Sequence, residues 1–536
     1  MNSFARLLES LIFSPRRSVK QAHLVDWIAQ TEFPDRGWGL AALIGELDFP
    51  AVKAGIIREL AADTTDKYLF ELSYDFVGDL AETVALLWPE GKAADRQEGS
   101  KDEDEADIAS LTEIVDSLSS VSRAEAKPVL ASYLDQMNLS QRWTLLKLAT
   151  GGMRVGLSAR MARLAIAEYY RRDIAEIEEI WPLLSPPYAE LFDWLEGRTD
   201  RPSARGRAVF RPMMLAHPVD DASLDALSCD DWQIEWKWDG ARIQLVSAED
   251  GVRLFSRSGD DMSASFPELV APMGWKGVLD GEILAGRPDE IDSFNALQKR
   301  LNRKTASVKM QQANPVFLRF YDIMFVGETD LRTLPLSERR ERLEVQTEHI
   351  DHPHFDISPI LQAEDVAHLA RLRDECRQSR LIEGLMLKAK DSTYQAGRIK
   401  GAWYKWKRDP LLADLVMMYA QRGHGKRSSF YSDYSFGAWK DTEDGQELVP
   451  VAKAYSGFTD AELKKLDKFV KDHTTNRFGP VREVEHRLVV EIAFDSIHLS
   501  PRHKSGVAMR FPRVNLIRWD KPVEEADQLS DIKKLI

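Results

Sequence analysis

The period of the hydrophobic pattern in this chain changes near residue 200, and that change limits the folds that the chain can adopt. Before it, four segments repeat apolar residues at intervals of three and four, the spacing of helices that bury one face. These segments are residues 124–134, 142–149, 159–170 and 174–184. Pro182, Pro186 and Pro187 then interrupt the pattern, because proline has no amide hydrogen with which to continue a helix. We therefore expect an all-α N-terminal domain over residues 1–200.

Short strands replace the helices from about residue 209. Residues 252–255 (VRLF) and 317–320 (FLRF) are rich in β-branched and aromatic side chains, which favour strands, and residues 293–301 indicate a helix between them. We therefore expect an α+β domain over residues 208–408, entered through the polar, arginine-rich residues 198–207. Residues 88–107 carry many charges and two glycines, and we expect them to form a mobile loop between helices.

A smaller all-β domain is expected over residues 409–536. Residues 411–419 and 487–494 indicate two of its strands. A five-stranded OB barrel fits this length, and such barrels bind nucleic acid in a groove. The chain of 536 residues is thus expected to be multidomain.

Composition excludes several classes of protein. No run approaches the roughly twenty apolar residues of a membrane span, and residues 1–6 (MNSFAR) do not begin a signal peptide. We therefore expect no membrane partner and a cytoplasmic, nucleoid-associated location. Cys229 and Cys376 are the two cysteines, so neither a disulfide framework nor a four-cysteine zinc site can form.

The net charge of −14 argues against a nucleic-acid partner only if the total charge is considered without its distribution along the chain. Positive charge is concentrated in residues 398–427 and 502–521, where lysine and arginine far outnumber the acids. Phosphate contacts need positive charge only at the binding surface, so an acidic total is compatible with DNA binding. A solvated face is the alternative explanation of each charged run.

Lys237 lies within residues 235–242 (EWKWDGAR), whose K-x-D-G core suggests that the lysine acts as a nucleophile. Three fixed residues are a weak signal, but further short motifs follow in order. They are residues 254–259 (LFSRSG), 279–282 (LDGE), 320–322 (FYD), 383–388 (EGLMLK), 403–407 (WYKWK), 510–513 (RFPR) and 518–521 (RWDK). Together they resemble the motifs of the nucleotidyltransferase superfamily of DNA ligases and mRNA capping enzymes, and the last two resemble the C-terminal motif of ATP-dependent DNA ligases.

Two further features are specific to ATP-dependent DNA ligases. Residues 150–158 (TGGMRVGLS) resemble a signature of the helical DNA-binding domain of the larger enzymes, which implies that Arg154 contacts DNA phosphates. The alternative is a helix cap and turn with an incidental arginine. Capping enzymes lack such a domain, and NAD-dependent ligases carry a four-cysteine zinc module that this chain cannot build. The resemblance therefore implies ATP as the adenylate donor.

The resemblance implies that Lys237 takes AMP from ATP and passes it to a 5′-phosphate end. An amine attacks only when unprotonated, so its pKa near 10.4 must fall through burial or cationic neighbours. We expect Lys405 and Lys407 to supply that charge and to hold the α-phosphate. Glu383 is expected to bind Mg²⁺ or Mn²⁺, and Glu282 to bind the metal or the ribose.

The remaining motif residues are expected to bind the nucleotide. The resemblance implies that Glu235 accepts a hydrogen bond from the adenine amino group and that Tyr321 stacks on the base. It also implies that Arg242 and Arg257 contact ribose or phosphates, and that Arg398 assists the two lysines. Tyr321 could instead be a core residue, and Glu282 an exposed acid at a strand end.

The C-terminal basic residues are expected to act in two places. By resemblance, Arg510, Arg513, Arg518 and Lys521 belong to a mobile domain that approaches the ATP pyrophosphate during self-adenylation and then moves away. Lys426 and Arg427 are expected to lie in a loop that faces DNA.

Three hypotheses follow. The first is an ATP-dependent DNA ligase, monomeric, that seals nicks in double-stranded DNA in repair, recombination or replication, with a helicase or nuclease as a further partner. The second is an RNA-end ligase or capping guanylyltransferase, distinguished by nucleotide preference and duplex type. The third is a non-catalytic nick-binding protein, which is disfavoured because Lys237, Glu282, Glu383, Lys405 and Lys407 are all present.

Overall fold

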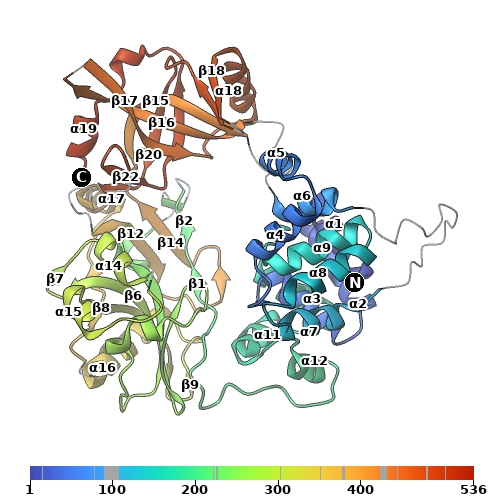
Figure 1. The fold of residues 1–536 in the computed structure, drawn as a ribbon. Coiled ribbons are helices and arrows are strands. Elements are labelled where there is room, and N and C mark those ends of the chain that lie inside the picture. The colour runs from blue at the N-terminus through green and yellow to red at the C-terminus, as the bar shows by residue number, and fades with distance from the viewer. Residues whose placement is uncertain are drawn as a thin grey trace. The chain divides into compact units, whose positions relative to one another are not determined.

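The computed structural model describes most of the chain. It leaves out residues 15, 78, 90–107, 221–222, 225–226, 302, 351, 377–378, 380, 423–430, 444, 479–480 and 501–502. The chain divides into two compact units. One contains Asp173–Leu184 and Gly197–Asp409, and the other contains Met1–Arg172, Ser185–Glu196 and Pro410–Ile536. Along the chain, helices come first, then mixed helices and strands, then mainly strands (Figure 1).

The described residues of the N-terminal region are helical apart from short connections. Its helices are α1 (Asn2–Phe13), α2 (Arg17–Gln30), α3 (Asp35–Ile44), α4 (Ala54–Thr64), α5 (Lys67–Val77), α6 (Leu80–Leu87), α7 (Leu111–Ser120), α8 (Ala126–Gln136), α9 (Leu139–Thr150), α10 (Ala159–Tyr170), α11 (Ile174–Ile180) and α12 (Ala189–Leu195). The prediction for α10 is confirmed at both ends. The helix predicted to start at residue 174 ends at Ile180, and a 3₁₀ turn containing Pro182 follows. Within the described residues, no helix has the length and apolar character needed to cross a membrane.

The loop predicted over residues 88–107 starts where α6 ends, at Leu87, but its first residue is anchored rather than mobile. Trp88 is buried at the C-terminus of α6, and its indole Nε1 donates a hydrogen bond to Oδ1 of Asp135 at 3.0 Å. An aromatic ring anchored in this way belongs to the helical core. Residues 90–107 lie outside the described residues.

Two five-stranded paths build the middle of the chain. The first runs β10-β8-β6-β4-β5, with β7 on β6 and β9 on β8, and the second runs β11-β3-β12-β14-β2. Their strands are β2 (His217–Pro218), β3 (Trp232–Trp238), β4 (Ala241–Ala248), β5 (Gly251–Ser256), β6 (Gly277–Arg287), β7 (Glu290–Ile291), β8 (Val316–Val326), β9 (Thr329–Asp330), β10 (Phe355–Ile357), β11 (Ile360–Leu361), β12 (Ile382–Ala389) and β14 (Trp403–Lys407). Strands β1 (Met214–Leu215) and β13 (Gly397–Arg398) pair separately.

Helices cover both sheets. They are α14 (Phe294–Leu301), α15 (Val308–Ala313), α16 (Leu336–Ile350) and α17 (Val366–Glu375). Leu343 of α16 and Leu297 of α14 pack into one core with the first sheet, whereas Leu369 of α17 packs with Ile234 and Leu385 of the second. Because strand side chains alternate between faces, Ile234 points to α17 while its neighbours Gln233 and Glu235 point to the other face.

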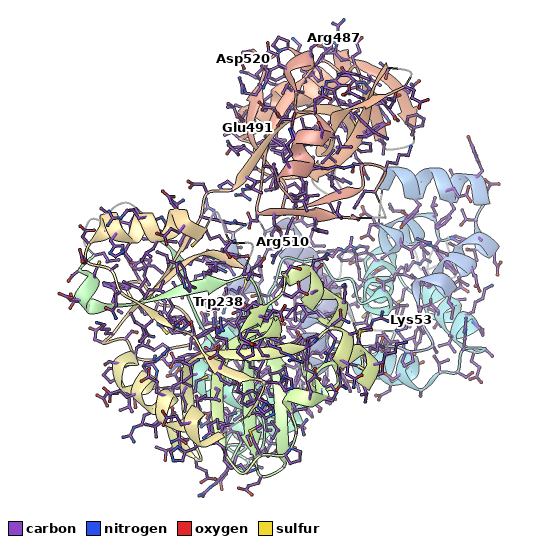
Figure 2. The ribbon with its side chains drawn as sticks, turned by 90° about the vertical axis from the view of Figure 1, so that its left-hand side faces the viewer. Lys53, Trp238, Arg487, Glu491, Arg510 and Asp520 are labelled. Carbon is purple, nitrogen blue, oxygen red and sulfur yellow. The ribbon has the colours of Figure 1, made fainter. Side chains whose placement is uncertain are left out.

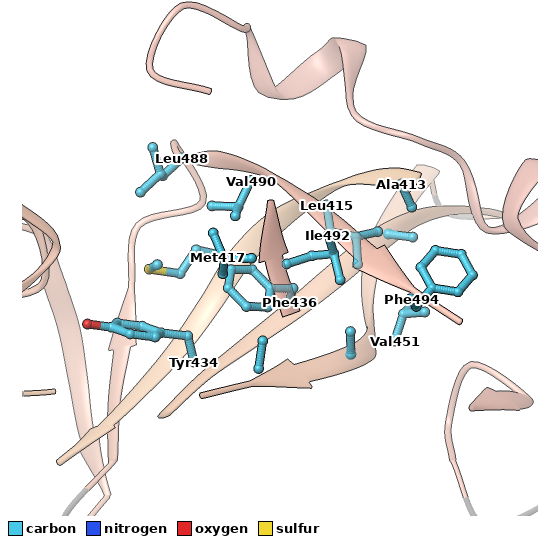
Figure 3. Close-up of a cluster of buried hydrophobic side chains, with 14 of the residues drawn as sticks. Ala413, Leu415, Met417, Tyr434, Phe436, Val451, Leu488, Val490, Ile492 and Phe494 are labelled. Carbon is cyan, nitrogen blue, oxygen red and sulfur yellow. The ribbon is translucent and has the colours of Figure 1, made fainter. Parts of the chain in front are cut away.

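The C-terminal region is rich in strands. Its elements are β15 (Leu411–Arg422), β16 (Tyr431–Thr442), β17 (Gly445–Ala454), α18 (Asp460–Asp472), β18 (Thr474–Phe478), β19 (Val481–Val484), β20 (Val489–Phe494), β21 (Ser496–Leu499), β22 (Val507–Arg510), β23 (Arg513–Arg518) and α19 (Leu529–Lys534). The predictions of strands near residues 411 and 489 are confirmed by β15 and β20. Alternate residues Ala413, Leu415 and Met417 of β15 pack with Phe436 and Ile492 in a buried core (Figure 3).

Candidate active site

One face of the second sheet gathers the predicted site residues of three neighbouring strands. Glu235 of β3 and Lys405 of β14 align across the same residue of β12, and Lys237 and Lys407 align across Gly384. Residues two apart in a strand share a face. The pairing therefore brings together side chains that are about 170 positions apart in sequence, although the spacing of the motifs does not reveal the strand order.

Lys237 forms an ion pair with the predicted metal ligand. Its Nζ donates to Oε2 of Glu383 at 2.5 Å, and Nζ of Lys407 lies 3.4 Å from the same oxygen. The register between β3 and β12 shifts beside Glu383. Gly384 has φ of +144°, and a Cβ there would lie 2.2 Å from the carbonyl oxygen of Trp406. Glycine after Glu383 thus permits the close approach of β14.

Positive charge is concentrated around Lys405. Burial lowers the pKa of Lys405, and the charges of Lys237, Lys407, Arg398 and Arg257 lower it further. In the part of the chain that the structure describes, no carboxylate forms an ion pair with Lys405, Arg398 or Arg257. Cations that repel one another and have no carboxylate partner favour a bound polyanion such as a triphosphate.

Glu282 of β6 lies beside this cluster and is not fully exposed. Burial raises its pKa to about 8, and the charge of Glu383 raises it too, while the charges of Lys237 and Arg242 oppose the rise. Its place is set in part by the glycine of the K-x-D-G motif. A Cβ at Gly240 would lie 2.6 Å from Cγ of Glu282, so the motif requires a residue without a side chain at this position.

Glu282 and Glu383 are the carboxylates available to a metal. Within the described residues, no three carboxylate, histidine or cysteine side chains gather as a metal site. Mg²⁺ in nucleotide sites usually takes one or two carboxylates and completes its octahedral shell with phosphate oxygens and water. The two carboxylates therefore fit a metal that binds together with a nucleotide.

A buried lysine that had no predicted role pairs with Glu235. Oε1 of Glu235 accepts hydrogen bonds from Nζ of Lys388 and Nε2 of Gln233, both at 2.7 Å, and all three side chains are buried. Nζ of Lys388 also lies 4.2 Å from the ring centroid of Tyr321, which is 9% exposed. Lys388 lies in the EGLMLK motif, but the motif does not show that its side chain on β12 reaches Glu235 on the neighbouring strand β3.

Arg242 is held in a fixed position by other protein groups. Its guanidinium donates to both oxygens of Asp280, at 3.0 and 2.6 Å, and to the carbonyl oxygen of Met214 at 2.6 Å. The hydroxyl of Tyr394 donates to the same carboxylate at 2.6 Å. The bidentate pair fixes the guanidinium, whose carbon lies 5.8 Å from the ring centroid of Tyr321. Asp280 stands in the LDGE motif, but sequence gave no indication of its partner.

Trp238 follows Lys237 at the end of β3 (Figure 2), and its indole is held in place by two contacts. The guanidinium carbon of Arg319 lies 4.3 Å from its ring centroid, and its Nε1 donates to Oγ of Ser358 at 3.2 Å. At this distance the guanidinium and the aromatic ring attract each other through a cation–π interaction. These contacts fix the end of β3 at which Lys237 lies.

The signature that contains Arg154 connects α9 and α10. Gly151 ends α9 in the left-handed conformation, and Ser158 caps α10 by accepting a hydrogen bond from the amide of Met161. Arg154 is exposed, with φ of +48°, between the buried side chains of Met153 and Val155. The helix cap is therefore present, and the loop presents Arg154 to solvent.

The C-terminal arginines lie on the β-rich region, as Figure 2 shows for Arg510. Arg513 donates to Oδ1 of Asp495 at 3.1 Å. Arg510 of β22 lies beside Phe511, whose ring is 61% exposed and whose φ is +53°.

The second basic block is paired with acids. Nζ of Lys521 donates to Oδ2 of Asp414 at 2.7 Å, and Arg518 pairs with Asp520 at 3.1 Å. Lys426 and Arg427, predicted to face DNA, lie outside the described residues.

Comparison with known proteins matches most of the chain. Residues 213–407 match the model of the ATP dependent DNA ligase domain, and residues 427–521 match that of the ATP dependent DNA ligase C terminal region. A probable DNA ligase of Koribacter versatilis (strain Ellin345) is 36% identical over 418 residues, which cover 73% of this chain and 71% of the relative. A DNA ligase of Thermococcus fumicolans is 32% identical, over 72% of this chain and 70% of its own.

Solved structures show the same fold. The structure named Pmar-Lig_Pre aligns with a TM-score of 0.59 at 16% identity, and the alignment covers 97% of this chain and 99% of that one. At this identity the likeness concerns the fold alone.

Proposed function

Because the chain belongs to the ATP-dependent DNA ligase family, we propose that it seals nicks in duplex DNA through an AMP adduct on Lys237. The observation that carries the proposal is the cluster of Lys237, Lys405, Lys407, Arg257 and Arg398, in which the pKa of Lys405 is lowered by burial and by the charges of the other four. Such a cluster binds a triphosphate and stabilises the charge that develops during transfer.

In the first step, Nζ of Lys237 attacks the α-phosphorus of ATP. A phosphorus–nitrogen bond forms while the bond to pyrophosphate breaks. The ammonium must first lose a proton, and Oε2 of Glu383, at 2.5 Å, is placed to hold it. Lys405 and Lys407 stabilise the phosphate oxygens as negative charge moves to the leaving group.

Two further transfers complete the reaction. An oxygen of the DNA 5′-phosphate attacks the AMP phosphorus, and the bond to Lys237 breaks. The 3′-hydroxyl then attacks the activated 5′-phosphate, forms the phosphodiester bond and releases AMP. Mg²⁺ or Mn²⁺, held by Glu282 and Glu383, would supply positive charge to the phosphates. A bound metal would favour the ionised form of Glu282, against the rise in its pKa that burial causes.

The nucleotide is proposed to bind along the same sheet face. Glu235 accepts from the adenine amino group, and Lys388 holds its carboxylate in place through the 2.7 Å ion pair. Tyr321 stacks on the base, which is typically worth about 1 to 3 kcal/mol. Arg257 and Arg398, both without a carboxylate partner among the described residues, contact ribose or phosphates. Arg242 acts through its pair with Asp280, by positioning Tyr321.

Three domains are proposed to share the DNA. Residues 1–200 form the all-α DNA-binding domain, in which Arg154 contacts phosphates, residues 208–408 form the adenylation domain, and residues 409–536 form an OB-fold domain. Arg510, Arg513, Arg518 and Lys521 approach the ATP pyrophosphate during self-adenylation, and Lys426 and Arg427 face the DNA afterwards. The ion pairs with Asp414, Asp495 and Asp520 must then exchange for phosphate contacts.

The wider setting is also a proposal. We propose a monomer that acts in the cytoplasm, on the nucleoid, and that works with a helicase or nuclease of DNA repair. A nick is the product of excision and of gap filling, so enzymes that remove or extend a strand must supply the substrate.

Nick sealing by the purified chain tests the function. With ATP and Mg²⁺, we expect a 5′-phosphorylated nick in duplex DNA to be joined, and GTP or a nicked RNA duplex to be poor substitutes. Lys405→Ala should lower the sealing rate by about 10²- to 10³-fold. Lys390→Ala, an exposed lysine whose Nζ donates to the carbonyl oxygen of Asp230, is the matched control. Sealing by Lys405→Ala at the control rate would exclude the assigned site.

A further inference from the structure

A cavity of about 500 Å³ lies at one end of the first sheet, away from the proposed site around Lys237. Residues 201–207 pass over it, and its floor is formed by the ends of β4, β6 and β8. All its lining residues belong to the unit of Asp173–Leu184 and Gly197–Asp409. Ala248 at the cavity is six residues along β4 from Arg242, which corresponds to about 20 Å. The cavity is therefore separate from the proposed ATP site, and its volume suits a small ligand.

Arg211 lines this cavity with few partners. The residue is 8% exposed, and its Nε is buried without a hydrogen-bond partner. Nη1 donates to the carbonyl oxygen of Val209 at 3.4 Å, and the guanidinium carbon lies 5.4 Å from the ring centroid of Phe325. Within the described residues, no carboxylate lies in ion-pair distance of Arg211. Burial lowers its pKa, and the more distant charges of Glu179 and Asp330 do not offset this effect.

The other buried arginines of this unit each have a carboxylate partner. The pairs are Arg300–Glu268, Arg319–Asp356, Arg339–Asp322 and Arg340–Glu344. An unpaired buried charge is costly, and proteins normally neutralise it with a partner. Arg211 has no such partner among the described residues, and it borders the cavity.

The backbone of Arg211 is firmly held. Oε1 of Gln244 accepts from its amide at 2.7 Å, and Nε2 of Gln244 donates to its carbonyl oxygen at 2.9 Å. Gln244 is fully buried on β4. Upstream, Oδ1 of Asp250 accepts from the amide of Ala208 at 2.7 Å. The segment that carries Arg211 is thus fixed to the sheet before any ligand binds, as a binding site requires.

The charges around the cavity are unequal. Two of its cations are paired, Arg201 with Glu179 and Arg205 with Glu328. The charged residues that remain are Arg207, Arg211, Lys276 and Glu249. Nζ of Lys276 donates to the carbonyl oxygen of Ala248 at 2.7 Å, and Arg207 is exposed. Three cations therefore face one carboxylate, which favours an anionic ligand.

We propose that this cavity binds a small oxyanion of the phosphate class, on the guanidinium groups of Arg211 and Arg207. Guanidinium groups bind phosphate oxygens through two parallel hydrogen bonds, and a buried one does so with little competition from water. A free phosphate and the phosphoryl group of a small metabolite share this chemistry. The site is independent of the proposed nick-sealing reaction and would be present in a chain that cannot be adenylated.

Inorganic phosphate is the probe of the first test. The Tm of the full chain is measured while phosphate replaces chloride at constant ionic strength, for wild type and for Arg211→Gln, Arg207→Gln and Lys405→Ala. We expect the rise in Tm to persist in Lys405→Ala, which removes a cation of the ATP site. We expect it to disappear in Arg211→Gln and the apparent Kd to weaken about tenfold in Arg207→Gln. Arg207 is exposed, so that variant tests the site even if Arg211→Gln does not fold.

Three results would overturn the proposal. The first is no rise in Tm beyond the chloride control. The second is a rise that Lys405→Ala abolishes and Arg207→Gln retains, because phosphate would then bind at the ATP site. The third is weaker binding of nicked DNA by Arg207→Gln with no effect of phosphate, because Arg207 would then contact the DNA backbone. With a phosphate effect in place, sugar phosphates compared with orthophosphate distinguish a metabolite from the free ion.

Discussion

Replacing Glu282 by glutamine should make the protein more stable at alkaline pH. Burial raises the pKa of Glu282 from its ordinary 4.5 to about 8. Between these two values the carboxyl of the folded protein stays protonated while that of the unfolded chain is ionised. The folded state therefore binds more protons, and the free energy of unfolding falls as pH rises through this window.

The size of the effect follows from the shift. The rise in pKa from 4.5 to about 8, at 1.36 kcal/mol for each pKa unit, corresponds to about 5 kcal/mol. The free energy of unfolding falls by this amount between pH 4.5 and pH 8 and does not change further above pH 8 on account of Glu282. Glu282→Gln has nearly the same shape and no carboxyl to ionise, so it lacks this loss. The free energy of unfolding of the variant should equal that of the wild type near pH 4.5 and exceed it by up to about 5 kcal/mol at pH 8.

Urea unfolding of the full chain from pH 4.5 to pH 9 measures the difference. Glu290→Gln, at an exposed position on β7, controls for the removal of one carboxylate. A difference between Glu282→Gln and wild type that does not change with pH would refute the reasoning. A variant less stable than wild type at pH 8 would show that Glu282 is ionised in the folded protein and stabilised by Lys237 and Arg242.

Three more changes test particular contacts. Lys388→Met leaves the buried carboxylate of Glu235 without its cation and should destabilise the protein by about 3 to 5 kcal/mol in urea unfolding; if Lys388→Met combined with Glu235→Leu recovers none of it, the pair is not the cause. Arg154→Ala should weaken binding to nicked duplexes of any sequence and reduce the slope of log K against log salt by about 1, at unchanged Tm; an unchanged slope would mean that Arg154 does not contact phosphate. Gly384→Ala places a Cβ 2.2 Å from a main-chain oxygen of β14 and should lower the free energy of unfolding by more than about 3 kcal/mol. Gly445→Ala, with φ of +120° and open space around the new Cβ, is the control and should lower it less.

The order of helices and strands could be predicted from sequence, because it depends on local periodicity. Residues 159–170 form α10 with the predicted ends, since Ser158 caps the helix and the apolar spacing continues to Tyr170. Trp88 follows α6 as predicted, but its anchoring was not foreseen, because its hydrogen bond to Asp135, 47 positions away, leaves no local pattern. The strand order β11-β3-β12-β14-β2 was beyond prediction for the same reason, since pairing is set by contacts between distant segments.

The motifs pointed to residues that the structure brings together, but not to the contacts between them. Lys237 and Glu383 are 146 positions apart, and each was found by its motif, but their ion pair was not. The pair of Lys388 with Glu235 was missed because EGLMLK places Lys388 among apolar residues, where a core strand is the simpler interpretation. Arg211 was not singled out in the sequence, because the lack of a partner for its buried Nε is visible only in the structure.

Labelling of Lys237 by ATP would decide whether this lysine carries the AMP. The full chain is incubated with Mg²⁺ and ATP labelled on its α-phosphate, beside Lys237→Ala, the control Lys390→Ala and labelled GTP. We expect a covalent AMP adduct in wild type and Lys390→Ala, none in Lys237→Ala or with GTP, and transfer of the label to nicked DNA. A label retained by Lys237→Ala, or an adduct formed from GTP in preference to ATP, would contradict this expectation. Protein without label is checked by intact mass for AMP already bound, and an unmodified, unlabelled wild type would likewise contradict it.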